Sequence, residues 1–151
     1  MAKNKIEGLA QAILENESRQ LNNVAKQIDK DIVKAAELIM DNSGKLVVCG
    51  LGKSGLIGEK IVATLCSTGT KSVFVHAAEA LHGDLGIYNP GDPTLLISKS
   101  GNTEELVRLI PILREFQSPL IALVGNMDSY MAKNADIVLN GTIESEVDPL
   151  G

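Results

Sequence analysis

The chain has 151 residues and a formal net charge of −5, with 14 basic against 19 acidic side chains. This length is typical of one domain, and the content of 44% hydrophobic and 22% charged residues excludes a disordered chain. The acidic excess argues against a nucleic-acid-binding surface, which needs clustered positive charge. With two Phe, two Tyr and no Trp, the core is expected to be aliphatic.

Neither a signal peptide nor a membrane-spanning run is recognisable in the sequence, so we expect a cytoplasmic protein without membrane contact. The two cysteines, Cys49 and Cys66, lie in apolar surroundings without a metal-ligand partner at short spacing. We therefore expect two buried, free thiols and no metal site.

The first 44 residues are predicted to be a helical lead-in. Apolar residues recur at steps of three and four from Ile6 to Ile28, and again from Ile32 to Met40. The segment Asn42-Ser43-Gly44 is typical of a helix end.

From residue 45 onward, short apolar runs alternate with helical patterns. The predicted strands cover residues 45–49, 72–75, 94–98, 120–124 and 136–139. The predicted helices cover residues 57–65, 103–116 and 129–134, and Pro111 is expected to kink or break the second. This alternation predicts an α/β fold, a five-stranded parallel sheet with helices on both faces, within a single domain over residues 1–151.

Ligands of such sheets bind beyond the carboxyl ends of the strands. The first loop there is Gly50–Gly55, with the sequence GLGKSG. A P-loop needs glycine where Val47 stands, and a dinucleotide site needs an acidic residue where the second strand ends at His76. Two interpretations remain: an anion site at a helix N-terminus with Lys53 and Ser54, or a tight turn with a solvated lysine.

The loop after the third strand carries three hydroxyls. Ser98, Ser100 and Thr103 surround Gly101 at the predicted start of a helix. We expect one hydroxyl to cap the helix, and the remaining donors, together with the free amides of its first turn, to bind a phosphate.

The loop 76–86 holds both histidines, His76 and His82, together with Glu79 and Asp84. Two histidines beside carboxylates above the expected site favour acid–base chemistry. A metal site is the competing interpretation, but no cysteine or dense carboxylate cluster completes it. Two further groups of acidic residues have strong alternative explanations, namely the helix dipole for Glu104 and Glu105, and a solvated acidic tail for residues 144–148.

Four motifs follow one another along the chain: GLGKSG, STGT (Ser67–Thr70), FVHAAEALHGDLG (Phe74–Gly86) and ISKSGNTEEL (Ile97–Leu106). In order and spacing they resemble the sugar isomerase (SIS) domain. The pair GKSG and HGDLG is similar, more narrowly, to the arabinose-5-phosphate isomerase branch. The resemblance runs from about Lys45 to Leu150.

The resemblance implies an isomerase that interconverts D-ribulose 5-phosphate and D-arabinose 5-phosphate by an enediol route, an early step toward the Kdo sugar of lipopolysaccharide or capsule. It implies neither metal nor organic cofactor. It also implies a homo-oligomer, a dimer or tetramer, with sites near subunit interfaces and the N-terminal helices in the contact. No nucleic acid or membrane partner is expected.

The same resemblance assigns roles to individual residues. The family's functional lysine, histidine and two glutamates fall on Lys53, His82, Glu105 and Glu146. The family's phosphate-binding residues fall on Ser54, Ser98, Ser100 and Thr103. We expect His76 and Asp84 to support the site.

Two features of the C-terminal end depart from the resembled family. Asp148 stands where the family has a cysteine, and the family continues with another helix and a further functional histidine. We therefore expect that helix to be missing from this chain, as are the regulatory CBS modules of many relatives. The alternatives are a sugar-phosphate-sensing module without catalysis and another isomerase of the SIS type.

Overall fold

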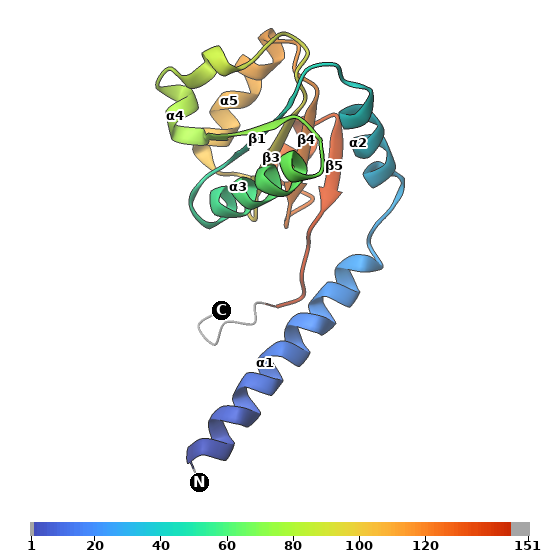
Figure 1. Cartoon of the computed structure of the whole chain (residues 1–151), viewed down its shortest axis with the longest axis vertical. Coiled ribbons are helices and arrows are strands. Elements are labelled where there is room, and N and C mark those ends of the chain that lie inside the picture. The colour runs from blue at the N-terminus through green and yellow to red at the C-terminus, as the bar shows by residue number, and fades with distance from the viewer. Residues whose placement is uncertain (1, 146–151) are drawn as a thin grey trace.

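Five parallel strands form one sheet in the order β2-β1-β3-β4-β5, in a computed structural model that describes residues 2–145 (Figure 1). The strands are β1 (Leu46–Gly50), β2 (Ser72–His76), β3 (Thr94–Ser98), β4 (Leu120–Val124) and β5 (Ile137–Asn140). Each neighbouring pair is parallel. The predicted five-stranded parallel sheet is thereby confirmed.

Six α-helices are described along residues 2–145. They are α1 (Ala2–Ala25), α2 (Lys30–Asp41), α3 (Gly52–Ser67), α4 (Ala77–Leu81), α5 (Glu104–Glu115) and α6 (Tyr130–Asn134). A short 3₁₀ helix at Asp84–Ile87 follows α4. Figure 1 shows α1 projecting away from the layered body. None of these helices is long and apolar enough to span a bilayer.

The sheet has an apolar layer on each face, because side chains of a strand alternate between its two sides. In β1, Val47 and Cys49 pack with α4, α5 and α6, whereas Leu46 and Val48 pack with α2 and α3. All five residues of β1 are buried. The prediction of helices on both faces is confirmed.

Three local predictions were wrong. Helix α3 begins at Gly52 rather than at Ile57, only one residue after β1 ends. The loop predicted over 76–86 contains α4 and the 3₁₀ helix. Helix α5 continues through the exposed Pro111, so the break considered there was wrong, since the buried leucines Leu109 and Leu113 on either side hold the helix against the sheet. That packing outweighs the roughly 3 kcal/mol that an interior proline costs.

The two thiols differ in environment. Cys49 is buried in β1, and burial raises the pKa of its thiol to about 12. Cys66 is exposed near the end of α3, so the prediction of two buried thiols was wrong for this residue. Helix α3 packs against the sheet through other residues. The Cys66 thiol instead donates a hydrogen bond to the Ser72 carbonyl oxygen at 3.3 Å. Hydrogen bonds with Ser72 lower the pKa of Cys66.

Candidate functional site

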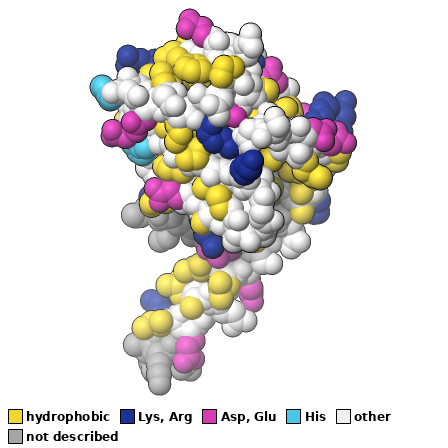
Figure 2. Space-filling model, turned by 45° about the horizontal axis from the view of Figure 1, so that its top comes forward, with side chains coloured by type: hydrophobic (Ala, Val, Ile, Leu, Met, Phe, Trp, Pro, Cys, Tyr) yellow, Lys and Arg dark blue, Asp and Glu magenta, His cyan; other side chains and the backbone are white. Residues whose placement is uncertain are grey.

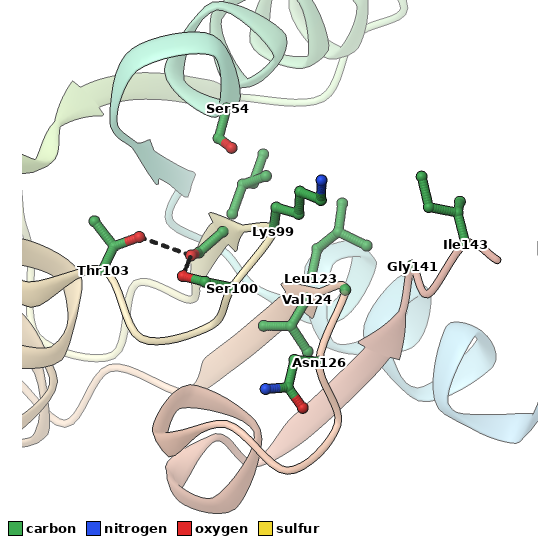
Figure 3. A pocket seen from close by; sticks show the side chains of 12 residues that line it. Ser54, Lys99, Ser100, Thr103, Leu123, Val124, Asn126, Gly141 and Ile143 are labelled. Atoms are coloured by element: carbon green, nitrogen blue, oxygen red, sulfur yellow. Dashed lines mark hydrogen bonds between the residues drawn. The ribbon is translucent and has the colours of Figure 1, made fainter. Parts of the chain in front are cut away.

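A cavity of about 700 Å³ opens at the carboxyl ends of β3 and β4 (Figure 3). It lies where the fold rule for parallel sheets places a ligand. All four residues predicted to bind phosphate line it: Ser54, Ser98, Ser100 and Thr103. The other lining residues are Ile97, Lys99, Leu123, Val124, Gly125, Asn126, Gly141 and Ile143.

Three hydroxyls form a hydrogen-bonded cluster in this cavity. Ser98 Oγ lies 2.7 Å from Thr103 Oγ1 and 3.4 Å from Ser100 Oγ. Ser98 Oγ also accepts a hydrogen bond from the Gly101 amide at 3.0 Å, and Ser100 Oγ accepts one from the Asn102 amide at 3.2 Å. The hydroxyls therefore hold the loop in shape and can turn their protons toward an anion.

The cluster stands at the N-terminus of α5. Thr103 is the N-cap residue, but its side chain makes no capping hydrogen bond, so the expected hydroxyl cap was wrong. Ser98 and Ser100 bind amides of the loop instead. The Val107 amide donates a helical hydrogen bond to the Thr103 carbonyl oxygen at 2.9 Å. The amides of residues 104–106 come before it, in the first turn, where a helix offers its own amides no acceptor. Such amides and the helix dipole favour a bound anion.

Neighbouring elements fix the loop between β3 and α5. The Gly101 carbonyl oxygen accepts from the Met131 amide at 3.0 Å, and Asn102 Oδ1 accepts from the Tyr130 amide at 2.8 Å. Gly101 has φ +64°, and a Cβ there would lie 2.1 Å from Ser129 Oγ. The loop is thus tied to the start of α6 and depends on glycine at position 101.

The three described residues that the resemblance marks as functional do not line this cavity. Lys53 is exposed in the first turn of α3, next to the cavity residue Ser54. Glu105 is half-buried in the first turn of α5. His82 is exposed at the end of α4. The fourth, Glu146, lies outside the described residues.

His76 and Asp84 line a second cavity, of about 610 Å³, beside the edge strand β2. Glu59 and Glu79 lie in the same lining. His76 Nδ1 is buried and has no hydrogen-bond partner among the residues described. Within residues 2–145, no three His, Cys, Asp or Glu side chains are grouped closely enough to hold a metal ion.

Sequence reasoning overlooked two polar residues of the main cavity, Lys99 and Asn126. A signal was present for both. Lys99 stands between the two serines of the predicted phosphate loop, and Asn126 follows the carboxyl end of β4. A lysine or an asparagine in a loop is also typical of a solvated surface, so residue type alone did not distinguish them.

Comparison with known proteins gives close relatives. The chain is 46% identical over 137 residues to the arabinose 5-phosphate isomerase KpsF of Escherichia coli O6:H1, with 90% of this chain and 42% of that protein covered. It is 43% identical over 141 residues to KdsD of Pseudomonas aeruginosa, an arabinose 5-phosphate isomerase, with 93% of this chain and 43% of that protein covered. The chain thus spans less than half the length of these curated relatives.

The fold also has a close counterpart among solved structures. The c3406 protein of E. coli CFT073, solved in complex with arabinose 5-phosphate, superposes with a TM-score of 0.95 at 34% identity. The match covers 100% of this chain and 80% of that one. The family model of the SIS domain matches residues 39–149, most of the chain. The chain therefore belongs to the SIS domain family.

Proposed function

We propose that the chain binds a sugar phosphate, with the phosphate at the hydroxyl cluster of Ser98, Ser100 and Thr103. The observation that carries this proposal is the convergence of these hydroxyls with the α5 N-terminus on one cavity. Ser54 reaches the same cavity from α3. The volume of about 700 Å³ is within the range of small-molecule sites and leaves room for a sugar beside the phosphate.

The reaction we propose is the interconversion of D-ribulose 5-phosphate and D-arabinose 5-phosphate. Two curated relatives at 43% and 46% identity carry the name arabinose 5-phosphate isomerase, and the matching E. coli structure holds arabinose 5-phosphate. The isomerisation removes a proton from C1, delivers one to C2, and transfers a hydroxyl proton between the two oxygens. It requires an acid–base group and a donor to the carbonyl oxygen, but no oxidant.

The groups proposed for this chemistry are Lys53, His82, Glu105 and Glu146. The described lining of the cavity contains neither a histidine nor a carboxylate. Lys53, Glu105 and Glu146 are each close in sequence to a residue of the cavity, namely Ser54, Thr103 and Ile143, and a second copy of the chain could supply His82. We therefore propose that the complete site combines the phosphate cradle of one copy with proton-transfer groups from outside the described lining.

We further propose that the chain forms a homo-oligomer through α1. Exposed apolar side chains recur along this helix at Ile6, Leu9, Ile13, Leu14 and Leu21. Figure 2 shows hydrophobic side chains along the projecting helix. Burying one such side chain contributes about 1.5–3 kcal/mol, so pairing this stripe with a second copy is favourable.

One alternative has a specific observation in its favour. The cavity holds the binding groups, whereas Lys53, His82 and Glu105 lie outside its lining. A module that binds a sugar phosphate without converting it needs only the groups that line the cavity. Vibrio vulnificus NanR, solved with ManNAc-6P, shares the fold with a TM-score of 0.78 at 18% identity, a likeness of fold alone.

Turnover separates the two functions. We expect the purified chain to convert ribulose 5-phosphate to arabinose 5-phosphate, followed by the anomeric proton signals in NMR spectra. In heavy water, the product should carry deuterium at C2. A Thr103→Val variant should bind both sugar phosphates more weakly, whereas Lys71→Met, at the opposite end of the sheet, should bind as the wild type does. Binding without turnover would favour the sensing module.

A further inference from the structure

Lys99 occupies a distinctive place in the main cavity. It lies between Ser98 and Ser100 in the loop after β3, and it is the one charged side chain among the described lining residues. Its side chain is exposed. The resemblance to arabinose-5-phosphate isomerases assigned the functional lysine to Lys53, which does not line the cavity. The lysine in the described lining is therefore Lys99, in addition to the lysine that the resemblance assigns.

The backbone of Lys99 is fixed against the next loop of the sheet. Its carbonyl oxygen accepts a hydrogen bond from the Gly125 amide at 3.0 Å. A Cβ on residue 125 would lie 2.8 Å from that oxygen, so the close approach depends on glycine. Both residues of this contact lie in loops that follow paired strands, β3 and β4. The backbone of Lys99 is therefore held in place beside the cavity.

The direction of the side chain separates it from the hydroxyl cluster. Figure 3 shows Thr103 and Ser100 on one side, where the Ser98 hydroxyl lies within hydrogen-bond distance of both, whereas Lys99 extends away from them toward the part of the cavity bordered by Leu123 and Ile143. A phosphate seated on the hydroxyls and on the α5 amides would leave its sugar chain on the lysine's side. The ammonium group then meets sugar oxygens rather than phosphate oxygens.

We propose that Lys99 is a substrate-contacting residue that donates a hydrogen bond to an oxygen of the sugar, and so selects phosphosugars over other phosphates. The inference rests on the proposed binding of a sugar phosphate. A hydrogen bond from a charged donor is stronger than one between neutral groups. If that oxygen is the substrate carbonyl, the same ammonium stabilises the negative charge that develops on it during enediol formation.

Two probes test this assignment by calorimetry near physiological ionic strength: arabinose 5-phosphate and inorganic phosphate. In Lys99→Met, we expect affinity for arabinose 5-phosphate to fall at least about tenfold, as loss of a charged hydrogen bond implies. Affinity for inorganic phosphate should fall about threefold or less, through screened long-range attraction alone. Thr103→Val should weaken both ligands in parallel. Lys71→Met, which changes the net charge equally, should weaken neither.

Equal losses for both probes in Lys99→Met would assign the ammonium to the phosphate and overturn the proposal, as would no loss for either. If Lys99→Met has a changed melting temperature, Lys99→Gln replaces it. The same comparison applies to it, namely the loss of affinity for arabinose 5-phosphate against the loss of affinity for inorganic phosphate. Wild-type binding without turnover would contradict the isomerase and leave the affinity ratios to decide on Lys99. Turnover with unchanged affinities in Lys99→Met would contradict Lys99 alone. A wild-type chain that binds neither probe would contradict both.

Discussion

The Ser98 hydroxyl combines a structural role with the binding role proposed above. It accepts a hydrogen bond from the buried Gly101 amide at 3.0 Å and lies 2.7 Å from Thr103 Oγ1. Ser98 itself is almost fully buried. Ser100 is exposed, and its hydroxyl accepts an amide that solvent can also reach. The two serines of the loop therefore differ in how much of the fold depends on them.

Ser98→Ala leaves the Gly101 amide buried without an acceptor. We expect this change to lower the free energy of unfolding by about 1–3 kcal/mol, measured by denaturant titration. Ser100→Ala serves as the matched control and should change stability by less than about 0.5 kcal/mol. Both variants should weaken the binding of arabinose 5-phosphate. Equal stabilities of the two variants would contradict the structural role of Ser98.

Asp92 is the buried carboxylate at the opposite end of the sheet. Burial raises its pKa, but hydrogen bonds from the Lys45 ammonium and from the Asn89 and Lys45 amides outweigh this effect and hold the pKa below its ordinary value. Asp92 is 2% exposed, and the Lys45 side chain is 22% exposed. The carboxylate joins the start of β1 to the turn before β3.

A carboxyl group whose pKa is lower in the folded chain stabilises the fold above its unfolded pKa, and this contribution is lost as the pH falls through the folded pKa. We therefore expect the free energy of unfolding to decrease with falling pH below about 4. Asp92→Asn should cost about 3 kcal/mol at neutral pH, since it leaves the lysine without its anion. Its stability should depend less steeply on acid pH than that of the wild type, and an identical pH dependence would contradict this account.

At the scale of elements, the loop between β3 and α5 contacts the start of α6 beside the cavity. Gly101 and Asn102 bind the first amides of α6, and the space beside Gly101 is filled by the Ser129 side chain. Helix α6 has five residues, too few to be stable without tertiary contacts. The loop and the helix therefore hold each other in place.

Gly101→Ala tests this coupling. Alanine at φ +64° is strained, and its Cβ would displace Ser129, so we expect a loss of about 2 kcal/mol together with weaker binding of arabinose 5-phosphate. Gly8→Ala in α1 is the control, because its Cβ meets nothing within 4 Å. That variant should keep or raise stability, by at most about 1 kcal/mol. Denaturant titration and calorimetry measure both effects.

The strands could be predicted because each is a short, largely apolar run, and β1 and β3 are buried along their whole length. The start of α3 could not, since Gly52-Lys53-Ser54-Gly55 has the composition of a loop and becomes helical only where Gly55 packs closely against Gly50. Tertiary packing of this kind overrides local propensity.

That Ser98, Ser100 and Thr103 lie together at a cavity could also be predicted, because they follow the carboxyl end of a recognisable strand and precede a helix. The place of Lys99 in the cavity lining was not predicted. Its relation to the cavity depends on the contact between the Lys99 carbonyl oxygen and the Gly125 amide, across two strands distant in sequence. The order of residues along the sequence does not show that these two loops contact each other.

For the molecule as a whole, α1 is attached to the body mainly near its C-terminal end. The buried Gln20 donates to Ser145 Oγ and accepts from the Glu144 amide, and Gln27 donates to the Thr142 carbonyl oxygen. Toward its N-terminus, the helix projects with its apolar stripe exposed (Figure 1). An exposed stripe of this length on an otherwise well-packed chain favours association with a second copy.

Leu9→Lys tests the association at the centre of the stripe. Leu9 is 62% exposed within one copy, so the substitution should barely change the stability of that copy, but a charge buried between two helices is strongly unfavourable. We expect the wild-type chain to sediment as an oligomer and Leu9→Lys to sediment as a smaller species. Gln11→Lys, on the exposed polar side of the same helix, should sediment as the wild type does. A monomeric wild type at high micromolar concentration would contradict pairing through α1, and the proton-transfer groups would then have to come from the same copy.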